Sequence, residues 1–304
     1  MIFKKSQNQN IQYYYENNIK QVIQNKTHNE KERQEKELIK EEKGENDPPW
    51  FKEKLIMHSI GKYNNQTYQD SYEALKYYFF EKKMHLMEID IVLTRDNHLV
   101  LNHLFLDLGF KPSLEEFKKL KASGNTTRMS FEDLVIFMEN NKDLYVITDT
   151  KYDDIFKISI QFEKMTSILK NHTELYERFI IEILNEKMYL YLKEEKQYLF
   201  KYYIFALYLR WDFSKGLKDF ENILNFTKKN KINAIAMDLN LFNQATIQLL
   251  RNYSIPVYLH TVNNIERAVD LIQKGVKGIM TDNLTYDLMD KYLLDTKMKL
   301  NQTY

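Results

Sequence analysis

Two histidines and two carboxylates in one part of the chain have the types and spacing that catalysis or metal binding would need. His58 ends a short apolar run, Glu88 and Asp90 lie in a β-rich segment, and His103 follows another apolar run. Residues two apart on a strand point to the same face, so the two carboxylates lie side by side. Two like charges held that close repel unless a cation lies between them, which indicates a site for a hard metal ion.

The simplest alternative is that these carboxylates lie on a solvated strand face and that the histidines are ordinary polar residues. Ile89, Ile91 and Leu93 point to the opposite face, so the alternation predicts which side of the strand is packed. The histidines at two strand ends shift the balance toward a functional site. An imidazole titrates near neutrality, so two of them can act as base and acid beside a cation.

Composition bounds the class of protein. The chain has 304 residues, of which 43% are hydrophobic and 29% charged, and this is enough for one large core. A formal net charge of +1 gives no field strong enough for general nucleic-acid binding. The absence of cysteine excludes disulfides and thiolate chemistry. No apolar run approaches the ~18 residues of a membrane span, and no leader-like apolar segment is seen, so we expect a cytoplasmic protein.

Residues 1–47 differ from the rest and are predicted to form a polar, charged helical extension or linker. Positions 26–46 are almost wholly polar with alternating charges, as in a solvated helix. Positions 11–23 are weakly amphipathic and could contact a partner or a membrane surface, although a peripheral helix is the simpler interpretation. Two adjacent prolines mark the boundary, and we expect the catalytic domain to span 48–304.

Beyond His103 the chain alternates strand-like and helix-like segments, which is the pattern of a parallel α/β sheet. The predicted strands are centred near positions 56, 90, 147, 181, 206, 236, 257 and 280. Eight strands with intervening helices over about 250 residues predict a closed (β/α)8 TIM barrel. An open doubly wound sheet is the alternative, but no glycine-rich phosphate loop follows the first strand.

Functional groups of such a barrel collect where its strands end. Glu182 lies mid-strand, where an unpaired carboxylate is costly to bury, so it lines the barrel mouth or faces solvent. Arg210 could contact a phosphate and Trp211 could form an apolar wall, although packing explains Trp211 equally well. His260 ends the seventh strand, where a lone histidine is more often a hydrogen-bonded structural residue.

The sequence resembles the glycerophosphodiester phosphodiesterases, which are TIM-barrel enzymes. Their signature is a histidine after the first strand, a Glu-x-Asp on the second strand and a second histidine after it. The matching residues here are His58, Glu88, Asp90 and His103. The blocks 67–75 and 87–96 resemble the family's first helix and metal-binding strand, and the resemblance covers roughly residues 54–290.

This resemblance implies a metal-dependent phosphodiester hydrolase, with Ca²⁺ or Mg²⁺ as cofactor and His58 and His103 as general acid and base. It implies that Asp149 is the third acidic ligand and that Lys151, two positions on, contacts the phosphate. It also places Glu182 and His260 near the site, as substrate or supporting contacts. Asp282 resembles the last-strand signature and either supports a neighbour or caps the next turn. The substrate would be a small-molecule or lipid-derived glycerol phosphodiester, and an internal hydroxyl could give a cyclic phosphate.

The sequence departs from the family pattern at two positions. Ser59 follows the first histidine where many members have arginine, and Leu104 follows the second where many have aspartate. These changes leave the phosphate contact and the substrate class open, and Lys151 or Arg210 would have to compensate. One alternative is a phospholipase similar to sphingomyelinase D or the phosphatidylinositol-cleaving enzymes, although the sequence shows no clear apolar rim or basic patch. The other is a non-catalytic phosphate-binding barrel.

Overall fold

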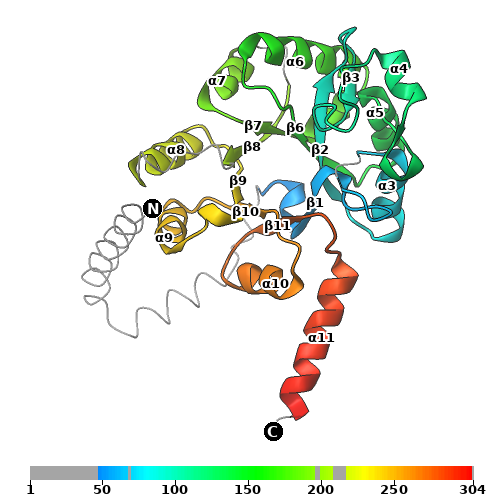
Figure 1. Ribbon diagram of the computed structural model, residues 1–304. Helices are drawn as coiled ribbons and strands as arrows, with labels where there is room; N and C mark the ends of the chain where they lie inside the picture. Colours follow the sequence, from blue (N-terminus) through cyan, green and yellow to red (C-terminus); the bar gives the residue numbers. More distant parts are fainter. Residues whose placement is uncertain (1–46, 68–69, 196–198, 208–216, 303–304) are drawn as a thin grey trace, which may run out of the picture. The chain divides into compact units, whose positions relative to one another are not determined.

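The computed structural model describes residues 47–67, 70–195, 199–207 and 217–302. These residues form a (β/α)8 barrel with helices around it, so the predicted TIM barrel is confirmed (Figure 1). Residues 1–46 of the predicted polar extension (1–47) lie outside the described residues, as do Arg210 and Trp211. Every helix in the described ranges is too short or too polar to cross a bilayer.

Eight parallel strands make the barrel, and β1 closes it by pairing with both β2 and β11. In chain order they are β1 (Leu55–Met57), β2 (Leu86–Leu93), β6 (Tyr145–Asp149), β7 (Phe179–Ile183), β8 (Tyr202–Leu207), β9 (Ala234–Asp238), β10 (Val257–His260) and β11 (Gly278–Thr281). Two short additions lie between β2 and β6. They are β3 (Leu99–Leu101), which pairs antiparallel with β2, and the ribbon of β4 (Lys121–Ala122) and β5 (Thr126–Thr127).

Helices follow the strands and cover the outside of the barrel (Figure 1). They are α3 (Tyr72–Lys76), α4 (Leu114–Lys119), α5 (Phe131–Asn140), α6 (Ile155–Leu169), α7 (Glu186–Glu194), α8 (Leu217–Lys229), α9 (Gln244–Tyr253), α10 (Ile265–Gln273) and α11 (Tyr286–Gln302). Short helical turns include η1 (Pro49–Lys52) and η2 (His58–Ile60). Several helices begin at polar caps. The Ser130 side chain, for example, accepts a hydrogen bond from the Asp133 backbone amide, and the Asp133 carboxylate accepts one from the Ser130 backbone amide.

Alternate strand residues build two separate cores. One set packs against the helices, while the other set fills the barrel interior. The interior set includes Ile56, Leu86, Ile147, Ile180, Tyr202, Ile204, Ala234, Ala236, Tyr258 and Met280. Trp50 of η1 belongs to the same interior cluster and is fully buried, with its ring 5.7 Å from that of Tyr258. The barrel is therefore filled by side chains rather than hollow.

A buried amide joins one helix to the two strands that carry the acidic residues. Gln161 of α6 donates from Nε2 to the carbonyl oxygen of Ile91 at 2.9 Å and to that of Thr150 at 3.0 Å. These carbonyls lie in β2 and just beyond β6, where the strand ladders end. The glutamine thereby satisfies backbone groups that would otherwise be buried without a donor, and it fixes the spacing of the two strand ends.

Candidate active site

The candidate site lies where the barrel strands end, and strand alternation places it there. Each of its main residues follows an apolar interior residue by two positions, or by four in the case of Asp90, so its side chain points to the same inner face. The residues are His58, Glu88, Asp90, Asp149, Glu182, His260 and Asp282, and they follow Ile56, Leu86, Ile147, Ile180, Tyr258 and Met280. Apolar interior residues thus form the floor, and the polar residues form the layer above it.

Three buried carboxylates come together within β2 and at the end of β6. The parallel register sets Asp90 beside Asp149. Glu88 lies two positions before Asp90 on the same face of β2. Carboxylate oxygens of Glu88, Asp90 and Asp149 all lie within 4.8 Å of one another. The alternative of a solvated strand face is therefore wrong for Glu88 and Asp90, since both are buried.

The ammonium group of Lys151 balances part of this negative charge. Its Nζ lies 2.6 Å from Oδ1 of Asp90 and 2.6 Å from Oδ2 of Asp149. The strand ends at Asp149, and Lys151 has a left-handed φ of 58°. Its backbone amide donates to Oδ1 of Asp149 at 2.8 Å, so a turn rather than a continued strand returns the lysine to the site.

Glu88 and Asp90 are both buried, but their pKa values shift in opposite directions. Burial and the nearby charge of Asp90 raise the pKa of Glu88 to about 8. Burial would also raise the pKa of Asp90, but its hydrogen bond with His103 and the ammonium of Lys151 hold that pKa below its ordinary value. The arrangement therefore concentrates negative charge on Asp90 and leaves Glu88 in need of a further cation to remain ionised.

A fourth carboxylate, Asp70, was not singled out from the sequence. It is fully buried, and no described residue gives either of its oxygens a hydrogen bond of normal geometry. Burial and the charges of Asp90 and Glu88 raise the pKa of Asp70 well above its ordinary value. A signal was present, because Asp70 directly precedes Ser71, which caps α3 in the block that resembles the family's first helix. The position of its side chain depends on the fold and could not be read from that pattern.

The donor set fits a hard divalent cation. Carboxylate oxygens are the ligands that Ca²⁺ and Mg²⁺ prefer, and three of them converge here from rigid strands. Four buried acids, namely Glu88, Asp90, Asp149 and Asp70, lie near one lysine, Lys151, in the described part of the chain. Excess buried negative charge of this kind is what a bound cation would neutralise.

His58 is held by a carboxylate from the opposite end of the domain. Its Nδ1 lies 2.7 Å from Oδ1 of Asp282, and Oδ2 of Asp282 accepts a hydrogen bond of 2.6 Å from Nδ2 of Asn263. Oδ1 of Asn263 in turn accepts from the Asp282 backbone amide at 2.8 Å. Burial lowers the pKa of His58, but Asp282 and the charge of Glu88 outweigh it, so this pKa lies above its ordinary value. The role of Asn263 has no sequence signal that we recognise.

His103 is held by one of the acids themselves. Its Nδ1 lies 2.8 Å from Oδ2 of Asp90, and the Ser59 hydroxyl donates to the same oxygen at 3.1 Å. The backbone amide of Ser59 donates to Oε2 of Glu88 at 2.8 Å. Ser59 therefore orients the acidic pair, at the position where many members of the resembling family have arginine. The structure brings both predicted histidines to the acid cluster.

Glu182 and His260 also lie at the inner face, with different surroundings. Glu182 is fully buried within β7, so the alternative that it faces solvent is wrong. His260 lies at the end of β10, where the register pairs it with Asp238 of β9. The pKa of His260 is lowered to about 4, mainly by burial. His58 and Lys151 also lower this pKa, whereas the charge of Asp238 raises it. This imidazole is therefore neutral near pH 7 and is suited to hydrogen bonding rather than to charge balance.

Solved structures similar to this chain share its fold. A glycerophosphodiester phosphodiesterase from Parabacteroides distasonis superposes with a TM-score of 0.60 and 18% identity, over 81% of this chain and 98% of that one. An Oleispira antarctica phosphodiesterase in complex with the product sn-glycerol-3-phosphate gives 0.59 and 14%, over 76% and 93%. A glycerophosphodiester phosphodiesterase from Agrobacterium tumefaciens gives 0.54 and 14%, over 78% and 98%.

The barrel is the one these enzymes use. The structural likeness therefore agrees with the fold that the sequence resemblance implied, and it extends over nearly the full length of the compared structures. No family model and no curated protein matches the sequence. At such low identity a shared barrel does not by itself carry an activity, so the function has to be argued from the site residues.

Proposed function

We propose that this chain is a phosphodiester hydrolase of the glycerophosphodiester phosphodiesterase type. The observation that carries the proposal is the pairing of each imidazole with its own carboxylate beside one buried acid cluster. His58 is paired with Asp282 and His103 with Asp90. A carboxylate that accepts from Nδ1 favours the tautomer in which Nε2 is the basic nitrogen, and a general acid or base requires such a defined proton position.

The two histidines divide the proton transfers. One imidazole takes the proton of an attacking hydroxyl, either of water or of the substrate's own neighbouring alcohol, as that oxygen bonds to phosphorus. The other gives its proton to the leaving alkoxide as the old phosphorus–oxygen bond breaks, because an unprotonated alkoxide leaves poorly. Attack by the neighbouring alcohol forms a cyclic phosphate, whereas attack by water forms the monoester directly.

Glu88, Asp90 and Asp149 are the residues that would hold the divalent cation, Ca²⁺ or Mg²⁺. Such an ion would offset the negative charge that builds on the phosphate oxygens. Lys151, which lies against two of these acids, would turn toward the phosphate as a second positive charge. Ser59 and Gln161 keep the acids and the strand ends in place throughout.

Glycerol 3-phosphate esters are the substrate class we favour. One structure with this fold was solved with the product sn-glycerol-3-phosphate, which supports that choice for this barrel. We further propose that residues 48–304 form the hydrolase domain and that residues 1–47 are an appended segment that could contact a partner or a membrane surface. A chain without cysteine is compatible with the reducing cytoplasm.

A panel of phosphodiesters tests the proposal. The full chain would be incubated with glycerophosphocholine, glycerophosphoinositol, lysophosphatidylcholine and bis-p-nitrophenyl phosphate, each with added Ca²⁺ or Mg²⁺ and each with EDTA. We expect release of an alcohol from at least one diester, with loss of turnover in EDTA. Binding of a diester without turnover under every condition would instead identify a phosphate-binding barrel and overturn the proposal.

A further inference from the structure

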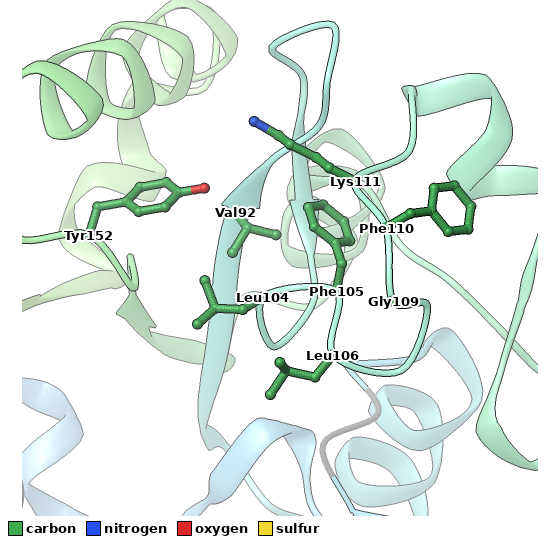
Figure 2. A pocket seen from close by; sticks show the side chains of 8 residues that line it. All are labelled: Val92, Leu104, Phe105, Leu106, Gly109, Phe110, Lys111 and Tyr152. Carbon is green, nitrogen blue, oxygen red and sulfur yellow. The ribbon is translucent and has the colours of Figure 1, made fainter.

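An apolar groove opens beside the candidate site. It has a volume of about 430 Å³ and is lined mainly by the loop after His103, with Val92 of β2 and Tyr152 on other sides (Figure 2). Three large apolar side chains of this loop are exposed to solvent: Leu104 by 41%, Leu106 by 72% and Phe110 by 49%. The sequence shows no clear apolar rim, and the structure corrects that expectation.

The backbone conformation of the loop and its hydrogen bonds keep these side chains exposed to solvent. Leu104 and Phe105 have left-handed φ values of 59° and 56°, which cost energy for residues with a β-carbon. The side chain of Asn102 accepts from the Phe105 backbone amide and donates to Oδ1 of Asp107 at 3.1 Å. Asp107 also accepts from the buried guanidinium of Arg128.

Arg128 completes the support beneath the loop. Its guanidinium lies 5.1 Å from the ring centroid of Phe117, which makes an edge contact with Phe105 at 6.0 Å. This loop has a strained backbone, is held by hydrogen bonds and still exposes apolar side chains. Exposed apolar patches on proteins commonly mark binding sites. The groove is therefore a candidate for recognition of an apolar ligand.

Residues that line the groove are close neighbours in the chain of residues in the proposed catalytic site. Leu104 directly follows His103 on one wall, and Tyr152 directly follows Lys151 on the other. Val92 lies on the same face of β2 as Asp90, two positions further along the strand. A group bound here would lie next to a phosphate held by Lys151 and the acid cluster, so the simplest occupant is another part of the same substrate molecule.

The chemistry of the lining selects the kind of group. Apart from Lys111 and the hydroxyl of Tyr152, the lining side chains are apolar, and no acid is among the lining residues. A cationic head group such as choline would meet the ammonium of Lys111 and no balancing charge. The groove is open to solvent on one side and has a volume of about 430 Å³, which is enough for one extended alkyl chain.

We propose that this groove binds the hydrocarbon tail of a single-chain phosphodiester such as a lysophospholipid. The tail would lie along Leu104, Leu106 and Phe110 while its phosphate reaches the acid cluster. This inference rests on the proposed function for turnover, but tail binding can be measured without it. The substrate would reach the site as a monomer, with its head group directed away from the groove.

The first test is calorimetric binding of n-alkyl phosphocholines of 6, 8, 10 and 12 carbons, below their micelle concentrations, to the full chain carrying His58→Ala. A methylene buried completely gains about fourfold in affinity, so we expect about twofold to fourfold per methylene in this open groove. The double variant Leu104→Ser, Leu106→Ser should flatten that dependence. The matched control is Leu190→Ser, an exposed leucine on α7, which should keep it.

The outcomes separate the tail proposal from the proposed function. If affinity rises with chain length in the His58→Ala protein while the wild-type chain turns over no diester, the groove proposal is supported and the proposed hydrolase is overturned. Turnover of glycerophosphocholine with affinity that is independent of chain length would do the reverse. Binding only to vesicles of phosphatidylcholine and phosphatidylserine, with no binding of monomers, would identify a membrane-contact surface and overturn the tail proposal.

Discussion

Nδ1 of His58 lies 2.7 Å from Oδ1 of Asp282, although 224 positions separate the two residues along the chain. His58 follows the first barrel strand and Asp282 follows the last, and these strands are neighbours because β1 pairs with β11. The pair belongs to a proposed acid–base site in which the carboxylate acts through the imidazole. Asp282 is thus a positioning residue, and its removal should change how His58 titrates.

Replacement of Asp282 by Asn should lower kcat/KM by about 10²-fold or more, because an amide does not stabilise the imidazolium and can select the wrong tautomer. Burial lowers the pKa of His58, and Asp282 is the strongest influence that raises it. Without that charge the pKa of His58 falls, so the limb of the pH–rate profile that it governs should move to lower pH. Movement of the acidic limb would identify His58 as the base, and movement of the basic limb would identify it as the acid.

The control for this experiment is Asp287→Asn, an exposed carboxylate on α11 that should leave both limbs in place. Thermal unfolding of both variants would show whether the barrel is intact. An unshifted profile in a folded Asp282→Asn protein would mean that Asp282 does not tune His58.

His58→Ala and His103→Ala should each reduce turnover of the best diester by about 10² or more, since each removes one proton transfer. The double variant should lose less than the product of the two effects, because groups that act as a unit are not additive. His98 is exposed, and His98→Ala provides the matched control at wild-type rate. A single variant with wild-type turnover would remove that histidine from the mechanism.

Divalent cations should stabilise the protein against heat. Saturation at about 100 times the dissociation constant is worth about 2.7 kcal/mol, which raises Tm by roughly 5 to 10 °C for a domain of this size. Asp149→Asn should abolish most of that increase, because Asp149 is one of three converging carboxylates. Differential scanning calorimetry with Ca²⁺, Mg²⁺ and EDTA would measure both effects. An equal increase in Tm for the variant would place the ion elsewhere.

Lys151→Met should destabilise the cation-free protein much more than the cation-bound protein. Without a cation, loss of the ammonium leaves buried carboxylates uncompensated and should cost about 3 kcal/mol of unfolding free energy. With a saturating cation most of that loss should be restored, so the increase in Tm on adding the ion should exceed that of the wild type. An unchanged increase would show that lysine and ion do not share the same acids.

Gly61→Ala should lower the free energy of unfolding by about 3 kcal/mol. Gly61 has a φ of +86°, and a β-carbon there would lie 2.5 Å from Cε of Met57 and 2.5 Å from the ring of Tyr78. Gly275 provides a matched control, since it has a φ of +93° but nothing within 4 Å of the added carbon. Gly275→Ala should therefore cost only the 1–2 kcal/mol or so of a left-handed residue. Equal costs in urea unfolding would mean that the contacts around Gly61 adjust freely.

The strands and the acidic pair could be predicted from the sequence because both depend on a local period of two. Leu86, Glu88 and Asp90 share one face of β2 whatever surrounds them, and the run of alternating strands and helices then defines the barrel. The resemblance to a known family added Asp149 and Lys151, which spacing alone indicated only weakly.

The remaining parts of the site depend on loops and distant contacts, which have no local period. Asp70 directly precedes the residue that caps α3, and Asn263 lies in the loop after β10. The outward leucines after His103 depend on left-handed backbone at Leu104 and Phe105, held by Asn102. These conformations are selected by tertiary partners, so the apolar groove could not be anticipated from residue types.

Closure of the barrel by β1 and β11 has a consequence for the newly made protein. On the ribosome, His58 is synthesised early, while its partner carboxylate emerges only after more than two hundred further residues. An incomplete polypeptide therefore holds the first imidazole without the group that orients it. The proposed catalytic pair of His58 and Asp282 would therefore form only when β11 pairs with β1.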